Sequence, residues 1–152
     1  LTIIGDGPLE HELRQLTVDL GVTERVSFRQ NIGDKELAQA FADCDVFVLS
    51  SVAKSEAFGL VQIEAMAYGK PVINTNLPRG VPYVSLDGQK GITVPPGDVD
   101  ALAIAMKTLA ENKDLRQQYG QAAKRRVRED FYMESMLDQI MAVYQKLMEQ
   151  PE

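Results

Sequence analysis

Two glutamates, Glu56 and Glu64, have seven residues between them and stand on either side of Phe58-Gly59-Leu60-Val61. The apolar spacing of residues 60–68 predicts a helix, so the backbone N–H groups at its start have no partner within that helix. The helix macrodipole gives this end partial positive charge, and anions such as phosphates bind readily there. We therefore expect an anion site at the amides of residues 58–61, where Gly59, which lacks Cβ, allows an anion to approach closely.

The two carboxylates add a second chemical property to this site. A carboxylate beside a phosphate site is poorly suited to bind the phosphate, but it accepts hydrogen bonds from hydroxyl groups of a sugar or a ribose. A diphosphate between two polyols is a nucleotide-sugar, so the pattern indicates a nucleotide-sugar site. A simpler interpretation also fits, because strand, loop and helix with a glycine occur in every doubly wound sheet. Glu56 would then be an acid at a positive helix end, and Glu64 an exposed helix acid.

The run from Ser55 to Val72, S-E-A-F-G-L-V-Q-I-E-A-M-A-Y-G-K-P-V, resembles the signature of the retaining GT-B glycosyltransferases of the group 1 family. In that signature two glutamates with seven residues between them bracket F-G-L/I-V, and E-A-M-A-x-G-x-P-V follows. The resemblance implies that this chain is the C-terminal, donor-binding half of a two-domain GT-B enzyme.

The resemblance also implies roles for individual residues near the predicted helix. It assigns the donor sugar to Glu56, Phe58 and Gly59, the diphosphate to the backbone amides of Gly59, Leu60 and Val61, and the ribose to Glu64. It places the base of the nucleotide near Ile32, largely on backbone, although Gln30 replaces the glycine that is usual there. Tyr83 stands where most members carry an acid in G-G-x-x-E, so no role is assigned to it. No residue of this chain is assigned as catalytic.

The rest of the chain predicts alternating strands and helices that hold these residues in place. The predicted strands are Leu1–Ile4, Arg25–Arg29, Val46–Leu49, Val72–Thr75 and Ile92–Val94. The predicted helices are Pro8–Leu20, Asp34–Asp43, Leu60–Tyr68, Asp98–Asn112, Asp114–Asp130 and Met133–Met148. Gly69 is expected as a left-handed cap after the third helix, and Asp98 is expected to cap the start of the fourth. The pattern indicates an α/β fold: a Rossmann-like parallel sheet with helices on both faces, ending in a run of helices.

Length and the first residues bear on domain organisation. At 152 residues the chain has the size of one domain, and we expect residues 1–152 to form a single nucleotide-sugar-binding domain. The chain begins with Leu1 and reads as strand at once, so we expect it to be part of a longer protein. The resemblance implies that the first strand and helix of this domain, and the whole N-terminal acceptor domain, lie in that longer protein. The chain alone is not expected to catalyse transfer.

Charge and hydropathy exclude several other classes of function. A net charge of −6 and a pI near 4.9 argue against nucleic-acid binding, which needs a basic face. The basic cluster Lys124, Arg125, Arg126 and Arg128 is interpreted as a solvated helix face, with weak contact to anionic lipid as the alternative. No apolar run approaches the ~20 residues of a membrane span. We expect a cytoplasmic location, with the longer protein at the inner face of the membrane as the alternative.

No metal or cofactor site is expected. The pair Asp43 and Asp45 precedes a strand, whereas ligands of parallel sheets collect at the carboxyl ends of strands. His11 has no second ligand beside it. Cys44 is the single cysteine, has no accompanying histidine, and is interpreted as a small buried residue.

For the longer protein, the resemblance implies a hexosyltransferase that moves a sugar from a nucleotide-diphospho-sugar to an acceptor, with retention of anomeric configuration and without a metal. Polysaccharide or glycolipid synthesis is the expected context. Two alternatives stay open: a nucleotide-sugar epimerase of the same fold, which would need carboxylate and histidine acid–base pairs, and a non-catalytic nucleotide-sugar-binding module. The sequence leaves the base, the sugar, the acceptor and the oligomeric state undetermined.

Overall fold

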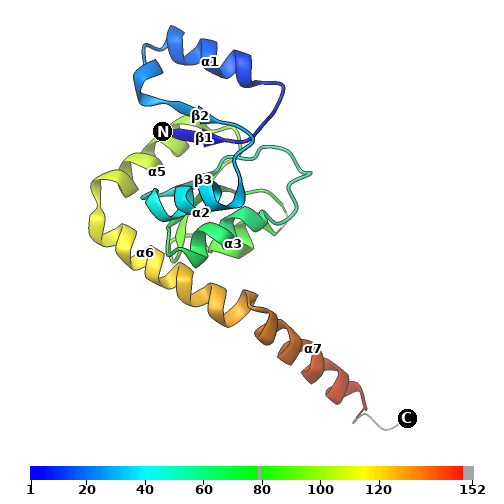
Figure 1. Cartoon of the computed structure of the whole chain (residues 1–152). Helices are drawn as coiled ribbons and strands as arrows, with labels where there is room; N and C mark the ends of the chain where they lie inside the picture. Colours follow the sequence, from blue (N-terminus) through cyan, green and yellow to red (C-terminus); the bar gives the residue numbers. More distant parts are fainter. Residues whose placement is uncertain (79, 149–152) are drawn as a thin grey trace. The chain divides into compact units, whose positions relative to one another are not determined.

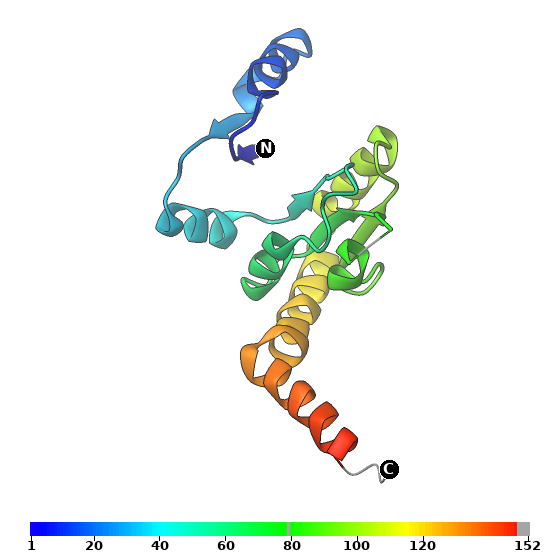
Figure 2. The ribbon, with the colours of Figure 1, turned by 90° about the vertical axis from the view of Figure 1, so that its right-hand side faces the viewer.

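The computed structural model describes residues 1–78 and 80–148. The chain divides into two compact units, Leu1–Ala40 and Phe41–Glu152, which we describe one at a time. Figures 1 and 2 trace the elements of both units along the chain. The expectation of one domain over residues 1–152 stays a prediction.

The first unit is a small parallel sheet with one connecting helix. Strands β1 (Thr2–Ile4) and β2 (Ser27–Arg29) pair in parallel, with Ile3 opposite Phe28. They are joined through α1 (Glu10–Asp19) and a short 3₁₀ turn, η1 (Thr23–Arg25). The guanidinium of Arg14 on α1 lies 4.5 Å from the centre of the Phe28 ring, so a cation–π contact ties helix to sheet. Helix α2 (Asp34–Asp43) follows and leads into the second unit.

The second unit is built on a three-stranded sheet in the order β3-β4-β5. Strands β3 (Phe47–Leu49), β4 (Val72–Thr75) and β5 (Gly91–Val94) are all parallel, and Ile73 pairs with Val48 on one side and Ile92 on the other. Their carboxyl ends therefore lie along one edge of the sheet, and the segments that leave those ends lie there too. The predicted parallel sheet is confirmed, with strand ends within two residues of the prediction.

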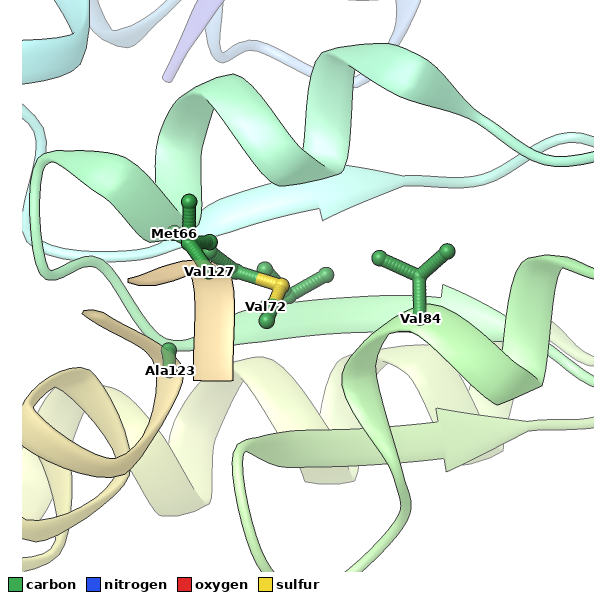
Figure 3. Packing of buried hydrophobic residues seen from close by; sticks show 5 residues of the cluster. All are labelled: Met66, Val72, Val84, Ala123 and Val127. Carbon is green, nitrogen blue, oxygen red and sulfur yellow. The ribbon is translucent and has the colours of Figure 1, made fainter. Parts of the chain in front are cut away.

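Helices cover both faces of this sheet because successive strand residues point to opposite sides. On one face Val72 packs with side chains from α3 (Leu60–Ala67), α4 (Val81–Ser85), α6 (Lys113–Arg126) and the π-helical turn η2 (Val127–Phe131). Figure 3 shows this cluster, which consists of Met66, Val72, Val84, Ala123 and Val127. On the other face Ile73 packs with Leu109 of α5 (Val99–Glu111) and with Tyr119 of α6. The prediction of helices on both faces is confirmed.

Local capping follows the sequence at two predicted places. Gly69 has φ 74°, the left-handed conformation expected after α3. The Asp98 carboxylate accepts a hydrogen bond from Ala101 N at 2.9 Å and caps α5.

Two elements differ from the prediction. The sequence predicted no helix between Thr75 and Ile92, but this segment contains helix α4, in which Val81 and Val84 are completely buried. Pro82 stands in the first turn of α4. At this position the N–H group that proline lacks would have no partner within the helix, and the fixed φ of proline suits a helix, so proline favours a helix start here. The helix predicted to Asp130 ends as α-helix at Arg126 and continues as the π-helical turn η2.

The last helix, α7 (Met133–Met148), extends away from the three-stranded sheet (Figures 1 and 2). One of its faces is apolar and exposed. The side chains of that face are 42–60% exposed: Met136, Leu137, Ile140, Met141, Val143, Tyr144 and Leu147. The sequence left open whether this face packs on the chain's own core or on a neighbouring chain, and it does not pack on the core of the described residues. Over residues 1–78 and 80–148, no helix combines the length and apolar character needed to cross a membrane.

Candidate functional site

The predicted anion site lies where the chain leaves the carboxyl end of β3 and enters α3. Gly59 is the N-cap of α3 and has φ 71° and ψ 59°, a left-handed conformation that glycine adopts without strain. A Cβ on Gly59 would lie 2.6 Å from Leu49 Cδ2 and 2.8 Å from Gln62 Nε2. The backbone angle and the packing inside the protein therefore both require glycine here. The sequence pattern had suggested a different reason, the close approach of an anion.

The amides at the start of α3 are open at three positions and occupied at one. Gly59 N donates a hydrogen bond to Glu56 Oε1 at 2.9 Å. Among residues 1–78 and 80–148, the N–H groups of Phe58, Leu60 and Val61 have no hydrogen-bond partner. The Leu60 side chain is 68% exposed, so this end of the helix faces solvent. Open N–H donors at a positive helix end can bind an anion.

The two glutamates flank these amides, and both carboxylates are free of counter-charges in the described part of the chain. Glu56 is half-buried in the loop before α3, and Glu64 is exposed on the second turn of the helix. Neither carboxylate forms an ion pair with a described residue. Glu56 uses Oε1 to accept from Gly59 N, and its other carboxylate oxygen has no described partner. Both acids can therefore accept hydrogen bonds from hydroxyl groups.

A buried polar network lies directly beneath this helix start, and sequence reasoning missed it. Gln62 of α3 and Asn74 of β4 are both completely buried. Gln62 Nε2 donates to Phe58 O at 2.9 Å and to Val81 O at 3.2 Å, while Asn74 Nδ2 donates to Gln62 Oε1 at 2.9 Å and to Val81 O at 3.0 Å. The signal in the sequence was a glutamine and an asparagine at positions that the helix and strand patterns place in the core.

The segment after β4 lies against the loop before α3. Gly80 N donates to Ala57 O at 2.8 Å, and a Cβ on Gly80 would lie 2.4 Å from the Phe58 ring. At the other end of α4, Arg126 donates from Nε to Val84 O at 3.0 Å and from Nη2 to Tyr83 O at 2.9 Å. Tyr83, to which the sequence gave no role, is 58% exposed. The Arg126 guanidinium lies over its ring, 4.9 Å from the ring centre.

The remaining sequence candidates lie elsewhere. Ile32 is half-buried between β2 and α2 in the unit Leu1–Ala40, whereas residues 56–64 belong to the second unit, so the base-binding assignment stays a prediction. Gln30, near it, donates to Glu10 Oε2. His11 is exposed.

The acidic pair and the cysteine do not form a site with other described residues. Asp43 ends α2, and Asp45 lies 3.9 Å from Arg116 Nε before β3 begins. Over the described ranges no group of three or more His, Cys, Asp or Glu side chains could hold a metal ion. Cys44 is half-buried, and this burial raises the pKa of its thiol, which makes it a poorer nucleophile at neutral pH.

A sequence model of the family described as glycosyl transferases group 1 matches residues 1–126. The chain is 32% identical over 149 residues to O-antigen chain mannosyltransferase C of Escherichia coli, covering 98% of this chain and 40% of that protein. It is 39% identical over 113 residues to D-inositol 3-phosphate glycosyltransferase of Streptomyces coelicolor, covering 74% of this chain and 24% of that protein.

Solved structures show the same similarity in three dimensions. The crystal structure of HepE from Anabaena in complex with UDP-glucose aligns with a TM-score of 0.81 at 28% identity, over 95% of this chain and 40% of that one. Sucrose-phosphate synthase from Thermosynechococcus elongatus aligns with a TM-score of 0.82 at 29% identity, over 97% of this chain and 38% of that one. The aligned part of the chain thus spans about a quarter to two fifths of the length of these relatives.

Proposed function

The chain belongs to the glycosyl transferases group 1 family, and from this premise we propose that it is the donor-binding part of a hexosyltransferase. The intact protein would move a sugar from a nucleotide-diphospho-sugar to an acceptor and retain the configuration at the anomeric carbon. The structure of HepE in complex with UDP-glucose supports a nucleotide-sugar as the donor, since 95% of this chain aligns with that structure.

One observation carries the proposal: the open amides of Leu60 and Val61 stand in the chain between Glu56 and Glu64, whose carboxylates have no ion-pair partner among the described residues. Amides fixed at a helix end stabilise the negative charge that develops on a leaving diphosphate, and they need no reorganisation to do so. This is the physical basis for proposing a metal-independent reaction without a cofactor.

The two acids then have separate tasks. Glu56 and the neighbouring Phe58–Gly59 segment would contact the donor sugar, with the free oxygen of the Glu56 carboxylate accepting from a sugar hydroxyl. Glu64, exposed on the second turn of α3, would accept from the ribose. Ile32 would lie near the base.

The catalytic groups and the acceptor site are proposed to lie in an N-terminal domain of the longer protein. The relatives are more than twice as long as the matched region, which supports a further domain. The exposed apolar face of α7 is a candidate contact for it. Without that domain, we expect the chain to bind a nucleotide-sugar weakly and to transfer nothing. A cytoplasmic location, with the intact protein in weak contact with the membrane, remains a prediction.

The alternatives from the sequence are less well supported. A nucleotide-sugar epimerase of the same fold is not favoured, because the family model and the named relatives are glycosyltransferases. A non-catalytic binding module would keep the donor site, and the activity of the intact protein distinguishes it.

The experiment is a calorimetric titration of the intact protein in EDTA with UDP, GDP, UDP-glucose and GDP-mannose, followed by proton NMR of the free sugar that forms when water slowly replaces the acceptor and hydrolyses the bound donor. We expect one nucleotide and its sugar conjugate to bind without a divalent cation, and the first product to keep the anomeric configuration of the donor. Absence of binding by all four compounds, or affinity that appears only with Mg²⁺ or Mn²⁺, would contradict the proposal.

A further inference from the structure

Two fully buried amide side chains link the start of α3 to the segment that follows β4. Gln62 belongs to the first turn of α3, and Asn74 to the middle strand β4. Both hydrogens of each amide group are used, since each nitrogen donates to two acceptors at 2.9–3.2 Å. Thr93 Oγ1 of β5 then donates to Asn74 Oδ1 at 2.7 Å and fixes the orientation of that amide.

The network holds a single peptide group from both sides. Phe58 O and Gly59 N belong to the same peptide unit, so they point in opposite directions. Gln62 Nε2 binds the carbonyl at 2.9 Å, and Glu56 Oε1 binds the N–H at 2.9 Å. The orientation of this peptide therefore fixes where the Glu56 carboxylate stands, although Gln62 itself is out of reach of solvent.

The same amide also fixes the neighbouring loop. Val81 O, at the first residue of α4, accepts from both Gln62 and Asn74. Gly80 is in close contact with Phe58 and bonds to Ala57 O. The separation between residues 57–59 and residues 80–81 is thus set by these two buried side chains together with the Gly80–Ala57 hydrogen bond, whereas the Leu60 and Val61 amides belong to the helix and bond to neither side chain.

We propose that Gln62, oriented by Asn74, is a positioning residue that determines how the sugar end of the donor is held. The inference rests on the proposed function, and it adds a specificity role for two residues that cannot themselves touch a ligand. Releasing the Phe58–Gly59 peptide moves Glu56, which is assigned to the sugar, and the loop at residue 80, which packs on Phe58, and it leaves the open amides of Leu60 and Val61 in place. The affinity for the nucleoside diphosphate alone should therefore depend on Gln62 less than the affinity for the nucleotide-sugar does.

The test compares two affinities in the intact protein and uses their ratio. UDP and UDP-glucose, or GDP and GDP-mannose if guanine is the base, are titrated into wild type and Gln62→Met, which keeps the length of the side chain but has no amide. We expect the affinity for the nucleotide-sugar to fall about tenfold relative to that for the nucleotide, which corresponds to about 1.4 kcal/mol. Thr93→Val, which removes one bond at the outer end of the network, should change the same ratio less and in the same direction.

Two controls separate positioning from general destabilisation. Ser85→Ala changes a fully buried hydroxyl that has no described hydrogen-bond partner, and it should leave the ratio unchanged. Leu109→Ala opens a cavity on the opposite face of the sheet, so it should lower the Tm without changing the ratio. If Gln62→Met lowers the Tm too far, Thr93→Val carries the test.

The outcomes are distinct. If wild type binds and both affinities fall by the same factor in Gln62→Met and Thr93→Val, the positioning role is wrong and the proposed function stands. The same conclusion follows if Leu109→Ala changes the ratio as much as Gln62→Met does. If wild type binds neither nucleotide nor nucleotide-sugar, the proposed function itself fails.

Discussion

Replacing Glu56 by alanine should tighten the binding of a nucleotide but not the binding of its sugar conjugate. In the structure the Glu56 carboxylate accepts from Gly59 N at 2.9 Å, so it occupies one of the amides assigned to the diphosphate. Alanine frees that N–H group and removes a negative charge beside the site. Both changes should strengthen the binding of a nucleoside diphosphate. They should also favour a nucleotide-sugar, but this ligand loses the carboxylate that accepts from its sugar hydroxyls.

The magnitude follows from the energetics of a charged hydrogen bond. Such a bond contributes about 1.5–3 kcal/mol to stability when it is protected, and the half-buried position of Glu56 favours the lower value. A freed amide that binds diphosphate instead should thus tighten UDP or GDP by about tenfold at most. For the nucleotide-sugar, loss of the sugar contacts offsets this gain, so its affinity should stay constant or weaken. The ratio of the two affinities should therefore change by up to about tenfold if the nucleotide-sugar affinity stays constant, and by more if it weakens.

The assay is calorimetry or fluorescence competition on wild type, Glu56→Ala and Glu56→Gln in EDTA. Glu56→Gln keeps an acceptor for Gly59 N but has no charge, and it should fall between the other two. Asp98→Ala is the control, because it removes a carboxylate that also caps a helix N–H, at 2.9 Å from Ala101 N, but on α5. Equal weakening of nucleotide and nucleotide-sugar in Glu56→Ala would refute the reasoning, because Glu56 would then serve only to hold the loop.

Three further predictions follow from the same geometry. Glu64→Ala should weaken UDP or GDP by about tenfold and leave 2′,3′-dideoxy analogues unaffected, since the carboxylate is assigned to ribose hydroxyls; equal loss for both would rule out that role. Leu109→Ala should lower the free energy of unfolding by about 2–5 kcal/mol in urea, because this side chain is fully buried, whereas Ile140→Ala on the exposed face of α7 should change it by about 0.5 kcal/mol or less. Burial raises the pKa of the Cys44 thiol, so at about pH 8 a smaller fraction of it is thiolate in the folded chain than in the urea-unfolded chain. Alkylation at this pH should therefore be slower in the folded chain, and equal rates would contradict this.

The sequence predicted the parts of the fold that local patterns determine. Apolar runs at Val72–Thr75 and periodic residues at Asp34–Asp43 and Met133–Met148 gave elements with the same bounds as the structure. Gly69 and Asp98 were identified as caps from residue type and position alone. These features depend on a few neighbouring residues, so they can be read without knowledge of the fold.

What the sequence did not predict depends on contacts between distant segments. Helix α4 is five residues long and is stabilised by burial of Val81 and Val84 and by Arg126, more than forty residues further along the chain. The hydrogen bond from Gly59 N to Glu56 was also missed, because the spacing located both groups but not their orientation. Gln62 read as an ordinary helix residue, and its role appears only when Asn74 and Val81 are brought beside it.

The central claim is that open amides at the start of α3 bind the diphosphate of a nucleotide-sugar. The most direct measurement is a ¹H–¹⁵N correlation spectrum of the 152-residue chain in EDTA, titrated with UDP and with GDP. We expect one of the two nucleotides to give saturable chemical-shift changes that are largest at the amide protons of Leu60 and Val61. Saturable binding that leaves both of these amides unshifted would contradict it.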